Sequence, residues 1–234
     1  MTTSPNRAAA YSPIRVLIVD DDALSRGGLV ALLGYAPDIE VMGERSDGIE
    51  VNAALLELRP DVALLDVRMP RVDGVAAVQL AQGLPVSTRF LMMTAFDDDA
   101  KVLDAIAAGA TGFLLKDEGP EGIIAAIRNV ASGEAAFSGR SAGHLTRWVR
   151  ESSSALAHRD ATEQMALLTP RERDIALALV TGAGDRELAA TLHVAESTIK
   201  STLAAIHTKW GTKNRTQIAV LVARSGLDLG RPSN

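Results

Sequence analysis

The chain has no cysteine among its 234 residues. Disulfide bonds, thiolate nucleophiles and cysteine-based metal sites are therefore all excluded. It has only 4 histidines, which are scattered, so a zinc site is not expected either. No stretch approaches the roughly eighteen apolar residues of a membrane-spanning helix. Residues 1–13 carry too weak an apolar run for a signal peptide and are expected to form a flexible tail. We therefore expect a cytoplasmic protein without membrane association.

Charge is distributed unevenly along the chain, although the net charge is only −5. Residues 1–129 hold 11 Lys and Arg against 19 Asp and Glu, whereas residues 165–234 hold 9 against 6. No acidic residue occurs between Glu196 and Asp228, and 5 basic residues lie in that interval. An acidic first part joined to a basic last part suggests a regulatory module attached to a nucleic-acid binder. On charge alone, an ordinary solvated helix surface is an equal alternative.

Residues 14–132 alternate strand-like and helix-like patterns five times, and most of the strand-like runs are continuously apolar. Such runs predict strands buried on both faces, as in a parallel sheet covered by helices. The fold class we expect is α/β, a flavodoxin-like (βα)₅ doubly wound sheet with strand order 2-1-3-4-5. The strands are expected near residues 15–19, 39–43, 62–66, 89–94 and 111–115, and the helices near 24–34, 48–58, 75–82, 98–108 and 120–132.

Five polar residues stand at the ends of four of these strands, namely Asp20 and Asp21, Asp66, Thr94 and Lys116. Ligands of a doubly wound sheet bind outside the carboxyl ends of its strands, so we expect these side chains to share one pocket. Clustered carboxylates suit Mg²⁺, and a carboxylate neutralised by a metal can attack a phosphoryl donor. Lys116 and Thr94 would then bind the phosphoryl oxygens. The alternative, that residues 20–22 only cap the first helix, does not account for all five positions.

From Leu168 onward the pattern is helical, with helices expected near residues 170–181, 185–192, 196–209 and 214–225. A three-residue turn between the second and third of these indicates a helix-turn-helix, so we expect a small all-α domain of four helices. Residues 133–164 lack a strong apolar pattern and are expected to be a linker with one short helix near 141–151. In the fourth helix, the stripe of Ile218, Leu221 and Val222 suggests either core packing or a self-complementary dimer contact.

The third of these helices is expected to read DNA. Its apolar stripe at Ile199, Leu203, Ile206 and Trp210 should pack on the domain core, leaving the opposite face for the major groove. We expect base contacts from Ser197, Lys200, Ser201 and Ala204, and phosphate contacts from Thr198, Thr202, Lys209, Lys213 and Arg215. Taken alone, the same pattern is compatible with a plain amphipathic helix.

These motifs together resemble the NarL/FixJ family of two-component response regulators. The first part is similar to a receiver domain in the segments VLIVDD (16–21), LLDVRMP (64–70), DG (73–74), MTA (93–95) and GATGFLLKD (109–117). The second part is similar to a LuxR-type helix-turn-helix in LTPRER (168–173), ELA (187–189) and VAESTIK (194–200). The resemblance gives five segments: a tail at 1–13, a receiver domain at 14–132, a linker at 133–164, a DNA-binding domain at 165–228 and a tail at 229–234.

The resemblance also implies individual roles. Asp66 would accept the phosphoryl group, with Asp20, Asp21 and the backbone carbonyl of Arg68 completing the Mg²⁺ site. Thr94 and Lys116 would read the phosphoryl group, and Phe113 would be the aromatic switch residue. The implied partners are a cognate histidine kinase, double-stranded promoter DNA and, on activation, a second copy of the chain.

Two other functions remain as alternatives. The helical domain could engage a sigma or anti-sigma partner instead of DNA, and salt-dependent binding to duplex DNA would separate the two. A dehalogenase-like phosphatase also uses an aspartate nucleophile with Mg²⁺, but it would normally carry a second aspartate two residues later. That position is Arg68 here, so we expect that the protein is not an enzyme.

Overall fold

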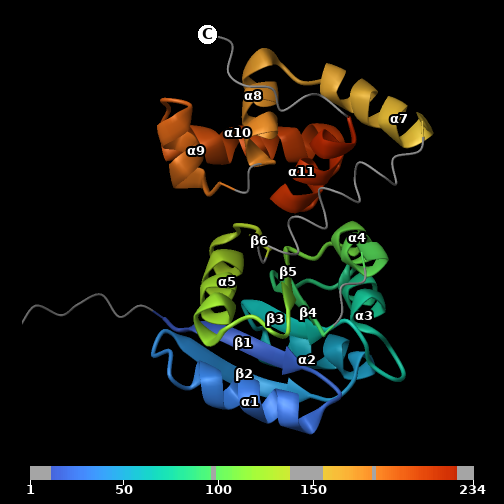
Figure 1. Ribbon diagram of the computed structural model, residues 1–234, viewed down its shortest axis with the longest axis vertical. Helices are drawn as coiled ribbons and strands as arrows, with labels where there is room; N and C mark the ends of the chain where they lie inside the picture. The colour runs from blue at the N-terminus through green and yellow to red at the C-terminus, as the bar shows by residue number, and fades with distance from the viewer. Residues whose placement is uncertain (1–11, 96–98, 138–154, 181–182, 226–234) are drawn as a thin grey trace, which may run out of the picture.

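A six-stranded parallel sheet forms the centre of the N-terminal domain (Figure 1). The computed structural model describes residues 12–95, 99–137, 155–180 and 183–225. The strands are β1 (Ile14–Val19), β2 (Ile39–Arg45), β3 (Val62–Asp66), β4 (Arg89–Thr94), β5 (Gly112–Leu115) and β6 (Ala136–Phe137). Their order, β2-β1-β3-β4-β5-β6, confirms the predicted doubly wound arrangement and adds one strand at its edge.

Helices cover both faces of the sheet, which explains why the central strands are apolar throughout. They are α1 (Ala23–Leu33), α2 (Val51–Leu58), α3 (Gly74–Ala81), α4 (Asp99–Ala108) and α5 (Pro120–Ser132), with a 3₁₀ turn η1 at Gly48–Glu50. Leu33 of α1 and Ile127 of α5 are buried against one face, whereas Leu55 of α2 and Val78 of α3 are buried against the other. Burial on both faces fixes the strand ends, and with them the positions of the polar residues that follow.

Two elements fall inside the segment that was expected to be a linker. The strand β6 pairs with β5 through Ala136 and Phe137, and the helix α7 (Ala155–Ala166) begins well before residue 165. Met165 of α7 is 1% exposed and belongs to the core of the C-terminal domain, so this helix is part of that domain. The short helix expected near 141–151 lies outside the described residues.

The C-terminal domain packs α7 with four further helices, α8 (Pro170–Leu179), α9 (Asp185–Thr191), α10 (Glu196–Trp210) and α11 (Arg215–Arg224). The turn between α9 and α10 confirms the predicted helix-turn-helix. Ile199, Leu203 and Ile206 of α10 are buried in the core as expected, and the Trp210 Nε1 donates to the Gln164 carbonyl at 2.9 Å. In the described parts of both domains, no helix is long and apolar enough to cross a membrane.

The start of α8 is fixed by a capping box. The Thr169 hydroxyl accepts from the Glu172 backbone N–H, and the Glu172 carboxylate accepts from the Thr169 backbone N–H at 2.8 Å. Lys209 of α10 lies 2.6 Å from the same carboxylate. The Lys209 ammonium and the Thr169 N–H hold the pKa of Glu172 below its usual value of 4.5. This carboxylate therefore joins the first turn of α8 to the end of α10.

Glu172→Gln should destabilise the C-terminal domain by about 1 kcal/mol at neutral pH, since it weakens the cap and loses the Lys209 pair. A depressed folded-state pKa adds stability above the usual carboxyl pKa, and that stability is lost as pH falls through the folded value. The variant and the native protein should therefore converge in strongly acidic solution. Urea unfolding followed by tryptophan fluorescence measures this, with Glu163→Gln at an exposed position of α7 as control. A difference that is independent of pH would contradict the assigned role.

Candidate functional site

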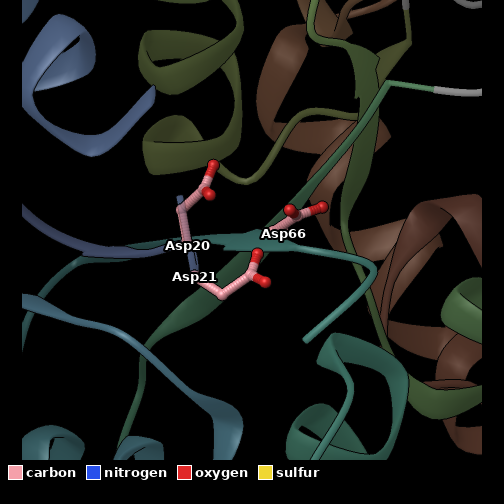
Figure 2. A group of neighbouring side chains, drawn as sticks. All are labelled: Asp20, Asp21 and Asp66. Atoms are coloured by element: carbon pink, nitrogen blue, oxygen red, sulfur yellow. The ribbon is translucent and has the colours of Figure 1, made fainter. Parts of the chain in front are cut away.

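Three carboxylates meet at the carboxyl edge of the sheet. Asp20 and Asp21 follow β1, and Asp66 is the last residue of its neighbour β3 (Figure 2). Each offers a carboxylate oxygen, and these three oxygens lie within 4.8 Å of one another. Asp20 and Asp66 are 2% and 8% exposed, whereas Asp21 faces solvent. The predicted convergence is thus present, with one side open to a reactant.

Lys116 lies between two of the acids. Its ammonium is 2.6 Å from the Asp20 carboxylate and 2.7 Å from the Asp66 carboxylate. Burial favours the neutral amine, but hydrogen bonds to Asp20 and Asp66 outweigh it and raise the pKa of Lys116. The lysine is therefore a permanent cation in contact with the Asp66 oxygen.

Burial is also the main influence on Asp66. It raises the pKa of the Asp66 carboxyl, and the Lys116 ammonium counters this only in part. The other Asp66 oxygen accepts from the Arg68 backbone N–H at 3.2 Å. A buried carboxylate with a neighbouring carboxylate gains from additional positive charge, which favours a bound cation.

Asp20 and Asp22 have separate roles at the start of α1. The Asp22 side chain accepts from the Leu24 N–H and caps the helix. Asp20 instead accepts from the Ser25 hydroxyl at 2.7 Å and the Asp22 N–H at 2.9 Å, which fixes its carboxylate toward the pocket. The capping alternative therefore holds for Asp22 and does not explain Asp20.

The donor set fits Mg²⁺. This ion prefers hard oxygen ligands at about 2.0–2.1 Å and keeps several waters, so two or three carboxylates and a carbonyl suffice. Asp20, Asp21 and Asp66 supply the carboxylates, and Asp21 lies on the solvent side, where waters can complete the shell. Arg68 directly borders this group, since its N–H already bonds to Asp66.

The two expected switch residues, Thr94 and Phe113, stand on the adjacent strands β4 and β5. Thr94 ends β4 and is 2% exposed, and its carbonyl accepts from the Lys116 backbone N–H at 2.7 Å. Phe113 of β5 is 1% exposed, and its ring is packed in the core on the side of α2, α3 and α4. The aromatic side chain thus points inward in this structure.

Gly74 belongs to the DG motif at residues 73–74, but the sequence did not indicate a role for it at the site. A Cβ at this position would lie 2.1 Å from the Asp66 carbonyl oxygen and 2.7 Å from the Met92 Cε. The first turn of α3 therefore contacts the backbone of Asp66 directly. Only glycine permits this approach.

The face of α10 that was expected to read bases is open to solvent. Ser197, Lys200, Ser201 and Ala204 are all exposed, and Lys200 pairs with Glu196 one turn earlier at 3.1 Å. Thr198 and Thr202, which flank this face, are partly exposed. The geometry is compatible with insertion of α10 into a major groove.

The three basic residues expected to bind phosphate differ in their surroundings. Lys209 is paired with Glu172, and Lys213 hydrogen-bonds to the side chain of Gln82 in the N-terminal domain. Arg215 is only 7% exposed, and its guanidinium lies 3.0 Å from the Asp185 carboxylate. The structure therefore does not support a phosphate contact for Arg215.

A contact between the two domains was not predicted. The first turn of α11 donates hydrogen bonds to backbone carbonyls of the segment 106–111, at the end of α4 and the start of β5. The Asn214 amide reaches the Gly109 and Ala110 carbonyls at 3.0 and 3.1 Å, and the Thr216 hydroxyl reaches the Thr111 carbonyl at 3.0 Å. The Gln217 amide reaches the Ile106 carbonyl at 3.0 Å.

An apolar contact and a second polar contact extend this junction. Val220 of α11 is 7% exposed and packs in the same cluster as Phe113 and Ile106. The Glu134 carboxylate accepts from the Asp185 N–H at the start of α9. We call the surface formed by residues 213–220 and the segment 106–111 the docking interface. It lies at the amino edge of the sheet, away from the acidic cluster.

Comparison with known proteins gives the same division of the chain. Residues 16–128 match the model of the response regulator receiver domain, and residues 166–222 match that of the bacterial regulatory proteins of the luxR family. The chain is 37% identical over 216 residues to the transcriptional regulatory protein LiaR of Bacillus subtilis, covering 92% of this chain and 99% of LiaR.

Two further relatives agree with this. Identity to the nitrate/nitrite response regulator protein NarL of Escherichia coli is 33% over 210 residues, covering 90% of this chain and 95% of NarL. The crystal structure of ChrA, a response regulator in a heme-sensing two-component system, matches 92% of this chain and 99% of ChrA at 30% identity with a TM-score of 0.51.

Proposed function

Because the chain belongs to the response regulators that join a receiver domain to a LuxR-type DNA-binding domain, we propose that Mg²⁺-dependent phosphorylation of Asp66 controls its binding to promoter DNA. The two domains make the protein a DNA-binding transcription regulator. The observation that carries the phosphorylation proposal is the cluster of Asp20, Asp21 and Asp66 with the Lys116 ammonium 2.7 Å from the Asp66 carboxylate.

The reaction we propose is the transfer of one phosphoryl group to Asp66. A carboxylate oxygen of Asp66 attacks phosphorus, and the bond from phosphorus to the nitrogen of a kinase phosphohistidine, or to the leaving oxygen of a small donor, breaks. The leaving group keeps the electron pair and takes a proton. Lys116 is close enough to bind the phosphoryl oxygens, and Asp20 holds its ammonium beside Asp66. We propose no turnover of an external substrate.

Mg²⁺ held by Asp20, Asp21, Asp66 and the Arg68 carbonyl would neutralise the charge that builds up between the carboxylate and the phosphoryl oxygens. The chain itself supplies the orientation. Asp66 is held by Lys116 on one oxygen and by the Arg68 N–H on the other. Asp21 is the exposed member of the cluster, and the donor would approach from its side.

The docking interface supports a role for the receiver in controlling pairing of the DNA-binding domains. It covers the side of α11 that carries Thr216, Gln217 and Val220, while the base-reading residues of α10 stay exposed. Two residues of the predicted stripe, Ile218 and Val222, are instead buried in the core of the C-terminal domain. We propose that the docked form can meet DNA as a single domain but cannot pair through α11. Release of α11 after phosphorylation would permit a homodimer on two half-sites.

The strand β5 connects the acidic cluster at one edge of the sheet to the docking interface at the other. Thr94 bonds through its carbonyl to Lys116, and Phe113 lies two residues after Thr111, whose carbonyl accepts from Thr216. We propose that a phosphoryl group on Asp66 draws in Thr94 and Lys116, shifts β5 and α4, and misaligns the carbonyls that α11 contacts. Since such hydrogen bonds need good alignment, a small shift weakens several at once.

The most direct experiment combines a small phosphodonor and Mg²⁺ with intact-mass measurement and sizing chromatography of the full chain. We expect the mass to rise by one phosphoryl group and the chain to shift toward a dimer. Binding to promoter duplex should then strengthen and should fall steeply as salt rises. No adduct would contradict phosphorylation, and binding that does not respond to salt would favour a protein partner of the sigma or anti-sigma type.

Lys200→Ala and Lys213→Ala should separate base reading from phosphate binding in the phosphorylated protein. Lys200→Ala should weaken specific binding by about 1–3 kcal/mol and relax the preference at one base pair in each half-site. Lys213→Ala should weaken binding to all sequences and flatten the salt slope by about one unit. Titrations of specific and scrambled duplexes at several salt concentrations measure both effects. Identical behaviour of the two variants would contradict this division of roles.

A further inference from the structure

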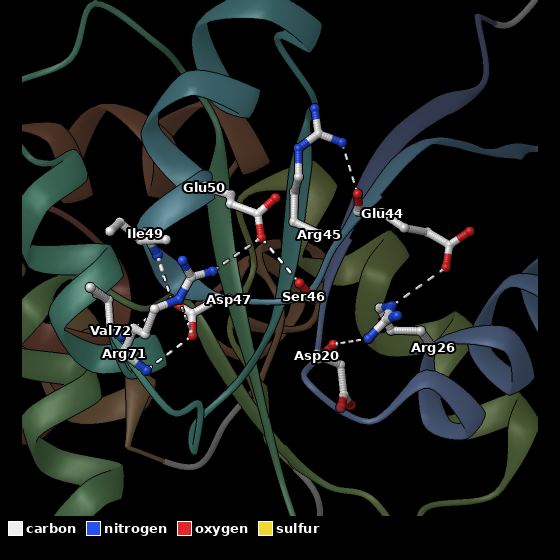
Figure 3. A network of polar contacts seen from close by, with 10 residues as sticks. All are labelled: Asp20, Arg26, Glu44, Arg45, Ser46, Asp47, Ile49, Glu50, Arg71 and Val72. Atoms are coloured by element: carbon white, nitrogen blue, oxygen red, sulfur yellow. Dashed lines mark hydrogen bonds and ion pairs between the residues drawn. The ribbon is translucent and has the colours of Figure 1, made fainter.

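Asp47, in the loop between β2 and η1, is a buried charge outside the acidic cluster. It is 2% exposed. One of its oxygens accepts from the Ile49 N–H at 3.0 Å and from the Val72 N–H at 3.2 Å, and the other accepts from the Arg71 N–H at 3.0 Å (Figure 3). A single carboxylate thus connects two loops that are more than twenty residues apart in the sequence.

Backbone donors, and not the nearby guanidinium, account for most of this connection. The Arg71 side chain is 61% exposed and approaches the Asp47 carboxylate only to 3.5 Å, so water screens the pair. Burial disfavours the charged carboxylate, but the three backbone N–H groups outweigh it and lower the pKa of Asp47. The carboxylate is therefore ionised and fully used in holding the backbone.

Gly48 adds a second connection between the same loops. Its N–H donates to the Val72 carbonyl at 3.2 Å. A Cβ at this position would lie 2.3 Å from the Val72 oxygen, which real side chains do not permit. The two backbones are therefore in direct contact, and the loop that contains Arg71 and Val72 cannot shift without moving Asp47.

That loop, residues 67–73, begins immediately after Asp66. At its start the Arg68 N–H donates to Asp66, and at its end the Gly74 N–H donates to the Val67 carbonyl at 3.0 Å. Asp73 caps α3 and pairs with Lys101 of α4 at 3.1 Å. The start of the loop is thus held by Asp66 itself, and Asp47 holds its second half through the Arg71 and Val72 N–H groups.

We infer that Asp47 is a positioning residue for the cation site: it fixes the loop that presents the Arg68 carbonyl to the metal held by Asp20, Asp21 and Asp66. It contacts neither the metal nor the phosphoryl group. This inference rests on the proposed function, since it assumes that the acidic cluster binds Mg²⁺. Partners that orient metal ligands from the outer shell typically change metal affinity about 10–100-fold when they are removed.

Mg²⁺ affinity of the unphosphorylated full chain, measured by titration calorimetry well below the unfolding temperature, tests this directly. Asp47→Ala should weaken Mg²⁺ binding at least about tenfold. Asp47→Asn should have a smaller effect. Its amide oxygen can still accept from the Ile49 and Val72 N–H groups, but its NH₂ group would face the Arg71 N–H, so that one hydrogen bond is lost. The matched control is Asp61→Ala, whose carboxylate accepts from the Arg15 N–H at the opposite edge of the sheet.

The outcomes separate clearly. Native Mg²⁺ affinity in folded Asp47→Ala overturns the inference, as does an equal loss of affinity in Asp61→Ala, which would trace the effect to general destabilisation. If Asp47→Ala does not fold, Asp47→Asn decides: weaker Mg²⁺ binding supports the inference, and native affinity overturns it. Failure of the native chain to bind Mg²⁺ would instead contradict the proposed function.

Discussion

Asp66→Asn is expected to gain no phosphoryl group from a small donor and Mg²⁺, whereas the native chain gains one. The amide nitrogen of asparagine is not a nucleophile, and the amide oxygen cannot form an acyl phosphate. Asp66 is the acid whose two oxygens are oriented by Lys116 and by the Arg68 N–H. The loss should therefore be complete, and so should the loss of phosphorylation-dependent dimerisation.

The same variant should stay folded and become slightly more stable without Mg²⁺. Burial raises the pKa of Asp66, so ionisation of this carboxyl costs the folded state stability once the pH exceeds the usual carboxyl range. Asparagine removes that cost, and Lys116 keeps its pair with Asp20. Intact mass and thermal unfolding measure the two effects, with Asp61→Asn as control. An adduct that persists on Asp66→Asn would assign the phosphoryl group to another residue.

Gln217→Glu should separate the two domains in the absence of phosphorylation. The Gln217 carbonyl oxygen accepts from the Lys213 N–H at 2.7 Å, and a carboxylate preserves that contact and suits the start of a helix. The Gln217 amide, however, donates to the Ile106 carbonyl, and a carboxylate there opposes the negative end of α4. Loss of this donor, together with the added repulsion, should weaken the free energy of docking by about 1–3 kcal/mol. This corresponds to roughly a 5–150-fold shift toward the open form.

Because the native chain lacks cysteine, two introduced cysteines can each carry a spin label without any native thiol reacting. Labels at the exposed positions Glu121→Cys of α5 and Thr191→Cys of α9 would report the distance between the domains. We expect a broad, longer distance distribution in Gln217→Glu and stronger binding to paired half-sites. Gln79→Glu, an equal charge change on the exposed side of α3, should change neither quantity. An unchanged distribution in Gln217→Glu would mean that α11 is not held through this side chain.

The sequence predicted those parts of the fold whose residues carry their own signal. The apolar runs identified the strands, and because parallel strands end at one edge, the convergence of Asp20, Asp66 and Lys116 followed. The strand β6 was missed because two residues cannot show a period. The helix α7 was missed because only Ala161 and Met165 are buried among the residues whose exposure is described there.

Charge in the sequence does not show which anion a basic side chain pairs with in the folded chain. Lys209 and Arg215 stand in a basic stretch and were assigned to DNA phosphates. In the fold, Lys209 pairs with Glu172 and Arg215 with Asp185, from segments far away in the sequence. A cation looks the same in a sequence whether its anion belongs to DNA or to the same chain. Only tertiary structure distinguishes the two.

The docking interface has a practical consequence for mutational mapping. On the receiver side most of its acceptors are main-chain oxygens, those of Ile106, Gly109, Ala110 and Thr111. Every amino acid carries such an oxygen, so alanine substitutions within the segment 109–111 would leave these acceptors in place. A scan of α11 would, by contrast, find the donors at once. On the receiver side, the side-chain substitutions that can weaken the contact are therefore those at Gln82, which bonds to Lys213, and at Ile106, which packs in the same cluster as Val220.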